Sequence, residues 1–319
     1  MITGYVGTYT SDLSEGIYKI GLDENNGHLE EPILFKKIKN SKYLVFVNDL
    51  LYSLYDDENG SGVMVIGKDG ITLASLIFEK VTSAHIAVKG NTIYTANYHE
   101  GTISKLHYEN EKLTFIKKYT VQRKAGCHQV IFFKDMILVP CLFMDKVFIF
   151  DEDLNLINEI MLPKGSGPRH GVISTDDTRL YILTELSNEL FTFDYANNHF
   201  HQVQQLSILP NYETHKEGSA ALRISRNGRK LYASTRGVDL ITVIDIGAEI
   251  PKIIQYESAG GNHPRDILDV ANDRYLLVLN RFSNELLSYR LNEGRIGVVS
   301  SKVKLPEGVS IAMEGDLND

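Results

Sequence analysis

The chain has 319 residues, of which 43% are hydrophobic and 23% charged, a composition typical of a globular protein with a large core. A formal net charge of −8 argues against nucleic acid or an anionic membrane as a partner, although it leaves room for a local cationic pocket. The two cysteines, Cys127 and Cys141, are too few for a disulfide framework or a zinc ribbon, and we expect them to be packing residues. Because no signal peptide or membrane-spanning run is recognisable, we expect a cytoplasmic protein.

In chain order, the elements repeat. Seven stretches have the pattern of a strand, a tight loop and a second strand, with Val, Ile, Tyr and Thr alternating between Gly, Asn or Asp. Most are preceded by one further short apolar stretch and followed by another. Their starts are 42 to 51 residues apart, at Tyr5, Tyr52, Tyr94, Leu138, Tyr181, Tyr232 and Leu277. Four strands per repeat predict an all-β fold, a seven-bladed β-propeller with four-stranded antiparallel blades.

The two ends of the chain complement each other. The first repeat begins too close to residue 1 to have its own preceding strand, whereas the segment Gly308 to Glu314 (GVSIAME) has a strand pattern and no repeat of its own. We expect this segment to close the ring by pairing with the N-terminal blade, which removes exposed sheet edges. Residues 1–319 are therefore expected to form one propeller domain.

Polar residues recur where inner strands begin and where the next strands end. In an antiparallel blade these two positions lie at the same end of the channel, so we expect a polar pocket there. Because neighbours on a strand point to opposite faces, Arg169 and His170 should not both face the channel. The positions are His85, His128, Arg169, His170 and Arg265 at strand starts, and Tyr9, Asp56, Asn97, Glu185, Arg236, Asn280 and Arg281 at strand ends.

Several motifs, in order, resemble those of the lactonase, seven-bladed β-propeller family, which includes propeller-type 6-phosphogluconolactonases and carboxy-muconate cyclases. They are YVGTYT, ANYHEGTIS, GPRHGVIS followed by LYILTEL, and NGRKLYASTRG. The resemblance covers essentially the whole chain and implies four catalytic residues, His128, Arg169, Glu185 and Arg236. The chain departs from the family in lacking most of its Asp-Gly turns, and blade two fits poorly.

Lactone hydrolysis requires a base for the attacking water and positive charge near the oxyanion. Glu185 or His128 would be the base, while Arg169 and Arg236 would hold the oxyanion or grip a phosphate or carboxylate. No compact metal-ligand spacing is present, so we expect no metal and no cofactor. Additional substrate-binding candidates, each with a structural alternative, are His85, Asn97, His170, Arg265 and Asn280. For Asn97 and Asn280 the alternative is capping of their loops.

The resemblance favours hydrolysis of 6-phosphogluconolactone, a small anionic sugar lactone of the pentose phosphate pathway. One alternative is a lactonising cycloisomerase of the carboxy-muconate type, which consumes no water. Another is a non-catalytic propeller that binds protein partners, which would expose hydrophobic side chains on one face. We also expect the segment Asn211 to Ser219 to form a longer loop over the channel mouth.

Overall fold

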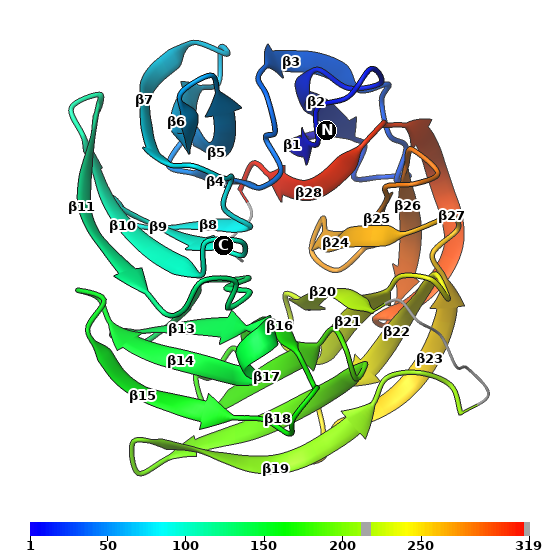
Figure 1. Ribbon diagram of the computed structural model, residues 1–319. Coiled ribbons are helices and arrows are strands. Elements are labelled where there is room, and N and C mark those ends of the chain that lie inside the picture. The colour runs from blue at the N-terminus through cyan, green and yellow to red at the C-terminus, as the bar shows by residue number, and fades with distance from the viewer. Residues whose placement is uncertain (212–217, 316–319) are drawn as a thin grey trace.

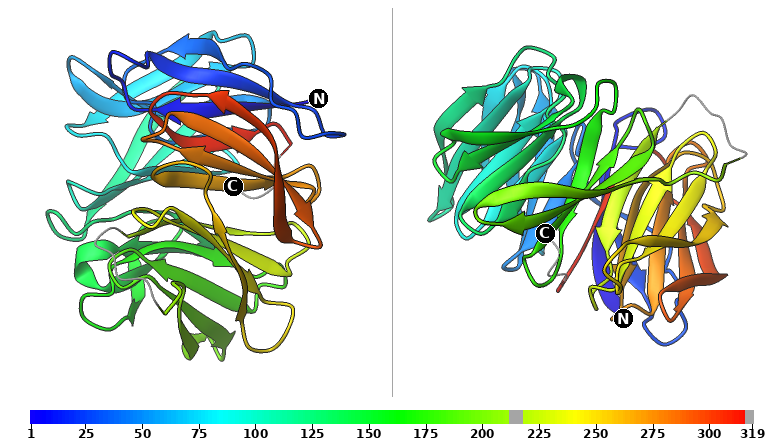
Figure 2. Two further views of the ribbon diagram at one scale, coloured as in Figure 1. Left: turned by 90° about the vertical axis from the view of Figure 1, so that its right-hand side faces the viewer. Right: turned by 90° about the horizontal axis from the view of Figure 1, so that it is seen from below.

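The computed structural model describes residues 1–211 and 218–315, which contain 28 strands and one short 3-10 helix. The strands form seven antiparallel sheets of four strands, arranged as blades around a central channel (Figure 1). Side views show the blades as twisted sheets packed next to one another around the ring (Figure 2). This is the seven-bladed propeller that the repeat predicts. Of the expected mouth loop, residues 212–217 lie outside the described residues.

The first four blades have the following strands, from the inner to the outer edge. Blade one contains β28 (Gly308–Met313), β1 (Ile2–Thr8), β2 (Gly16–Leu22) and β3 (Ile33–Lys37). Blade two contains β4 (Leu44–Val47), β5 (Leu50–Asp57), β6 (Gly60–Gly67) and β7 (Thr72–Glu79). Blade three contains β8 (His85–Lys89), β9 (Thr92–Asn97), β10 (Thr102–Glu109) and β11 (Lys112–Thr120). Blade four contains β12 (Ile131–Phe133), β13 (Met136–Cys141), β14 (Lys146–Asp151) and β15 (Leu156–Met161), with η1 (Leu142–Met144) after β13.

The remaining three blades follow the same order. Blade five contains β16 (Pro168–Ile173), β17 (Arg179–Thr184), β18 (Glu189–Ala196) and β19 (His199–Ser207). Blade six contains β20 (Ser219–Ile224), β21 (Lys230–Thr235), β22 (Leu240–Asp245) and β23 (Lys252–Ser258). Blade seven contains β24 (Pro264–Val270), β25 (Tyr275–Asn280), β26 (Glu285–Asn292) and β27 (Arg295–Lys304). No helix in these described segments has the length and hydropathy needed to cross a membrane.

The ring is closed by β28, which is the innermost strand of blade one although it comes last in the chain. It pairs antiparallel with β1, and Gly4 lies opposite Met313. Figure 1 shows the two strands side by side, one at each end of the colour scale. The Tyr5 hydroxyl also donates a hydrogen bond to Glu314 Oε1 (2.9 Å). The predicted closure is therefore confirmed, and pairing with β28 satisfies the edge of β1 that would otherwise be exposed.

Apolar clusters between neighbouring blades hold the ring together. Cys127 and Cys141 belong to the cluster that joins blades three and four, and both are completely buried. Their sulfur atoms lie 3.2 Å apart as free thiols. Burial, followed by the contact with Cys127, raises the pKa of the Cys141 thiol well above its ordinary value. The expected packing role of the two cysteines is confirmed.

Candidate active site at the channel mouth

One end of the channel opens into a pocket of about 260 Å³, the size of a small-molecule site. It is built from residues at the starts of inner strands and the ends of second strands, the two positions that the blade topology brings together. Six of the nine candidates from the sequence line it: His128, Arg169, His170, Glu185, Arg236 and Arg265. The other lining residues are Tyr9, Lys42, Tyr43, Ala84, Tyr98, His99, Asp266 and Val309.

Arg169 and His170 both line the pocket, contrary to the expectation from strand alternation. The reason is a β-bulge at the start of β16. Pro168 pairs with Thr184 and His170 pairs with Leu183, which leaves Arg169 as an extra residue without a partner in β17. A bulge changes the direction of the side chains around it, so two consecutive residues can face one pocket.

Glu185 bridges two arginines at the centre of the pocket wall. Its Oε2 lies 2.7 Å from Arg169 Nε, and its Oε1 lies 3.0 Å from Arg236 Nη2. Backbone carbonyls of blade six hold the same guanidinium groups, because Arg169 Nη1 donates to Ala220 O and Arg236 Nε donates to Gly218 O (2.8 Å). The two arginines are therefore fixed in orientation and linked through one carboxylate.

The charges around Glu185 determine its ionisation. Burial alone would raise the pKa of this carboxyl, but Arg169 and Arg236 outweigh burial and lower its pKa. Arg169 itself is almost completely buried, and burial, with help from Arg265 and Arg236, lowers the pKa of its guanidinium to about 9. Glu185 is thus a carboxylate at neutral pH, facing a pocket with excess positive charge.

His128 borders the same pocket as a neutral imidazole. Burial, followed by repulsion from Arg169 and Arg265, lowers its pKa well below the ordinary value. Its ring packs edge-on against Tyr98 (5.9 Å between centroids) and His170 (5.2 Å). Within residues 1–211 and 218–315, its buried Nδ1 has no hydrogen-bond partner. The imidazole is therefore unprotonated at neutral pH, which is the form that a general base requires.

His85 lies deeper in the channel, in a second pocket of about 290 Å³ lined by His85, Gln129, Arg223 and mainly aliphatic side chains. Its Nδ1 accepts a hydrogen bond from the Val130 amide (3.4 Å). Burial, followed by Arg223 and Arg169, lowers its pKa to about 3. His85 therefore lines the second pocket and not the mouth pocket.

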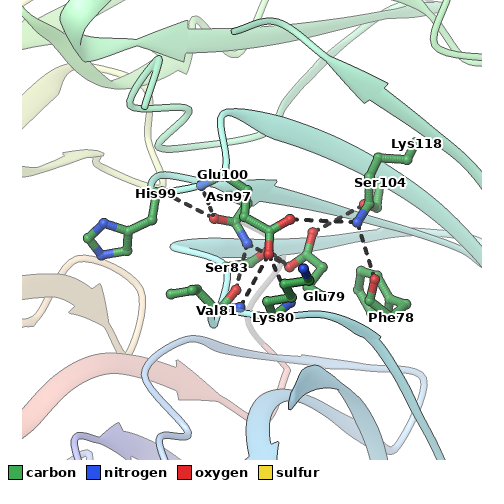
Figure 3. Close-up of polar contacts among 10 residues, drawn as sticks. All are labelled: Phe78, Glu79, Lys80, Val81, Ser83, Asn97, His99, Glu100, Ser104 and Lys118. Carbon is green, nitrogen blue, oxygen red and sulfur yellow. Dashed lines mark hydrogen bonds and ion pairs between the residues drawn. The ribbon is translucent and has the colours of Figure 1, made fainter. Parts of the chain in front are cut away.

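Asn97 and Asn280 also lie outside the mouth pocket, where they bond to neighbouring chain segments. Asn97 Nδ2 donates to Glu79 Oε2 (2.9 Å) and Val81 O (2.7 Å), while its Oδ1 accepts from the amides of His99 (3.1 Å) and Glu100 (2.9 Å) (Figure 3). Asn280 Nδ2 donates to Ala259 O (2.7 Å). The loop-capping alternative describes both residues, and Asn97 fixes the loop that brings Tyr98 and His99 to the pocket.

The lining residues that were not among the sequence candidates include Lys42, Tyr43, Tyr98 and His99. Lys42 and Tyr43 precede β4, the inner strand of blade two, where the repeat pattern is weakest. The polar sequence SKY before the apolar run LVFV is the same kind of signal as the arginine at the start of β16. Tyr98 and His99 follow Asn97 in the loop after β9, one and two positions beyond the strand end that the topology singles out.

Fold and site together define a seven-bladed β-propeller with a small cationic pocket at one mouth of its channel. The family model described as "Lactonase, 7-bladed beta-propeller" matches residues 3–313. The chain therefore belongs to this lactonase family, as the sequence motifs suggest.

Individual relatives are similar over nearly the whole chain. A Bacillus subtilis protein named 6-phosphogluconolactonase is 27% identical over 338 residues, which cover 97% of each chain. A solved structure from Lactobacillus plantarum has a TM-score of 0.92 at 26% identity, covering 98% of this chain and 99% of that one. The periplasmic gluconolactonase of Pseudomonas aeruginosa has a TM-score of 0.88 at 22% identity, with 98% of each chain covered, which is a likeness of fold.

Proposed function

We propose that this protein hydrolyses a sugar lactone in the mouth pocket, with 6-phosphogluconolactone as its substrate. The observation that carries the proposal is the Arg169–Glu185–Arg236 bridge beside a neutral His128. Membership of the lactonase family supports the reaction, and the name of the Bacillus subtilis relative supports the substrate. We also propose a cytoplasmic location, because the proposed substrate is a phosphorylated metabolite.

In the proposed mechanism His128 accepts a proton from water as the water oxygen attacks the lactone carbonyl carbon. The carbonyl electrons move onto oxygen, next to the guanidinium N–H groups of Arg169 and Arg236 that Glu185 does not occupy. Collapse of this intermediate breaks the bond to the ring oxygen, which takes the proton from His128. Glu185 acts as a positioning residue that keeps both arginines aimed and lowers the electrostatic cost of bringing them together. No metal is required.

The assay uses freshly prepared 6-phosphoglucono-δ-lactone, with spontaneous hydrolysis subtracted. We expect catalysis by the wild type and a loss of about 10²- to 10⁴-fold in kcat for His128→Ala. For Arg236→Ala the expected loss is about 10²- to 10³-fold. Arg290→Ala is a matched control because Arg290 is exposed on β26, outside the pocket lining. A folded wild type with no rate above background on this lactone, glucono-δ-lactone or a carboxylated lactone would disprove the proposal.

Isotopic labelling separates hydrolysis from the cycloisomerase alternative. In water enriched in ¹⁸O, hydrolysis puts one labelled oxygen into the product carboxylate, whereas a lactonising isomerase incorporates none. Mass spectrometry of the product distinguishes the two. Label in the enzymatic product above the spontaneous level is the result expected here.

One observation favours the scaffold alternative. Four apolar side chains on connections at the mouth side are more than half exposed: Leu13 (61%), Phe143 (54%), Leu186 (52%) and Phe282 (57%). However, the pocket between them is polar and cationic, and a flat protein-binding surface does not need such a pocket. The same lactone assay decides, because a non-catalytic scaffold predicts no rate above background for the wild type.

A further inference from the structure

Seven polar residues of the mouth pocket form two groups on opposite arcs of the ring. His128, Arg169, Glu185 and Arg236 come from blades four to six. Arg265, Tyr9 and Lys42 come from blades seven, one and two, which are neighbours because β28 lies between β24 and β4 (Figure 1). The first group contains the proposed reacting groups, and the second has no role in the mechanism given above.

The second group carries two cations, Lys42 and Arg265, that form no ion pair within the described chain. Arg169 and Arg236 share the carboxylate of Glu185. Asp266 forms an ion pair with Arg223, with 3.3 Å between Asp266 Oδ1 and Arg223 Nη2. Neither Lys42 nor Arg265 has a carboxylate of residues 1–211 or 218–315 within ion-pair distance, although both border the pocket. In a protein with a net charge of −8, such unpaired cations in a pocket call for an anionic ligand.

Lys42 and Tyr9 are held in place for such a ligand. Lys42 Nζ donates to Thr82 O (3.1 Å) and lies 6.0 Å from the centre of the Tyr9 ring. On the same ring, the Arg281 guanidinium carbon lies 4.3 Å from the centre, and Arg281 is itself fixed by Glu307 (2.9 Å). The Tyr9 ring therefore lies close to two anchored cations, and all three side chains are only partly exposed.

The electrostatic field at Tyr9 gives independent support. Burial would raise the pKa of the Tyr9 phenol, yet the combined effect of Arg265, Lys42 and Arg281 lowers it. Lys42 also contributes, after burial, to a lowered pKa of His99 on the neighbouring loop. The potential on this arc is therefore positive enough to outweigh the effect of burial on the Tyr9 phenol, and it favours bound negative charge.

We propose that Lys42, Arg265 and the Tyr9 hydroxyl form a subsite that binds the phosphoryl group of a phosphorylated sugar lactone, across the channel mouth from the reacting carbonyl. This assignment rests on the proposed function, since it names the part of the substrate that each arc contacts. An ammonium, a guanidinium and a hydroxyl offer more donors than a carboxylate accepts well, and they suit the three terminal oxygens of a phosphate dianion. The subsite would select phosphorylated over unphosphorylated lactones.

The test compares ligands that differ only in the phosphoryl group. Calorimetry measures binding of 6-phosphogluconate and gluconate, and kinetics measure kcat/KM for the two corresponding lactones. We expect the wild type to prefer the phosphorylated member of each pair. Lys42→Met and Arg265→Gln should each reduce that preference by about 10- to 100-fold, because each removes a charge-assisted contact. Lys42→Arg should retain most of it, and Lys112→Met, exposed on the outer strand β11, is the control.

The two proposals can fail separately. A wild type without lactonase activity whose preference for 6-phosphogluconate depends on Lys42 would overturn the proposed function and support the subsite. A wild type that hydrolyses both lactones equally well would overturn the subsite and leave the function standing. Equal weakening of both ligands in folded Lys42→Met, checked by its thermal melting, would also overturn the subsite.

Discussion

Arg169 and Arg265 occupy the same position in their blades. Each is the extra residue of a β-bulge at the start of an inner strand, and each follows a proline. Pro264 pairs with Asn280 and Asp266 pairs with Leu279, so Arg265 has no partner in β25. Arg169 likewise has no partner in β17. Proline tolerates the first position of a strand, and a bulge re-aims the next side chain. The repeated Pro-Arg pair thus directs one guanidinium from blade five and one from blade seven into the mouth pocket.

Because Glu185 bridges Arg169 and Arg236, we expect it to matter for stability as well as for the proposed activity. Glu185→Gln removes the carboxylate and leaves two largely buried arginines facing each other. We expect the free energy of unfolding to fall by about 3 kcal/mol, because breaking a buried ion pair leaves uncompensated charge. Lactonase activity per folded molecule should also drop, since the arginines lose their common anchor. Urea unfolding and steady-state kinetics measure the two effects.

Glu58→Gln is the control for this substitution, because Glu58 is exposed in the turn between β5 and β6. It should change the free energy of unfolding by less than about 0.5 kcal/mol. A Glu185→Gln variant as stable as Glu58→Gln would mean that the bridge contributes nothing to folding, and that prediction would be wrong.

Closure of the ring gives a second prediction. Ile311 lies in β28, is 2% exposed and packs in the cluster shared by blades one and seven. Ile311→Ala should lower the free energy of unfolding by about 2–5 kcal/mol, as expected for a truncation in a packed core. Val298→Ala on β27, where the side chain is 73% exposed, should cost less than about 0.5 kcal/mol. Equal effects of the two truncations in urea unfolding would argue that β28 does not hold the ring closed.

The fold was predictable because each repeat carries the same alternating pattern, and the ends of the chain are complementary. The mouth pocket was also predictable in outline, since blade topology alone brings His128, Glu185 and Arg236 to one end. What the pattern did not reveal is local register. A bulge inserts one residue without changing the composition of the strand, so alternation gave the wrong relation between Arg169 and His170.

The same reasoning explains His85 and Lys42. Strand β8 starts in regular register, with His85 opposite Ala96 and Ile86 opposite Thr95, so nothing turns the first side chain toward the mouth. Its blade therefore directs His85 into the deeper pocket. Lys42 was missed because it lies two residues before a four-residue inner strand, and so short a strand leaves little pattern to align.

Four buried imidazoles predict that the protein is sensitive to acid. Burial is the largest cause that lowers the pKa of these histidines, so the folded state keeps them neutral; they are His85, His128, His170 and His263. The unfolded chain protonates them below about pH 6.5, the ordinary value for histidine. Stability is therefore fully present above that pH and is lost as the pH falls, by up to about 1.4 kcal/mol per pH unit for each imidazole.

Urea unfolding between pH 7 and pH 5 measures this slope. His85→Gln should reduce it by about one quarter, since one of the four groups is removed. His28→Gln is the control because His28 is exposed on the connection between β2 and β3, and it should keep the wild-type slope. A free energy of unfolding that stays constant down to pH 5 would show that the folded state protonates these histidines readily.

Asn97 and Asn280 end equivalent strands, β9 and β25, but differ in the number of bonds they make. Asn97→Leu would remove one of the hydrogen bonds to the buried Glu79 carboxyl and leave the amides of His99 and Glu100 without their acceptor. We expect a loss of about 2–4 kcal/mol in the free energy of unfolding. Asn280→Leu removes one bond to Ala259 O and should cost about 1 kcal/mol. Because Asn97 holds the loop carrying Tyr98 and His99, its variant should also raise KM for the lactone, whereas Asn280→Leu should leave KM close to the wild-type value. A rise in KM for Asn280→Leu that equals the rise for Asn97→Leu would instead indicate that both residues touch the substrate.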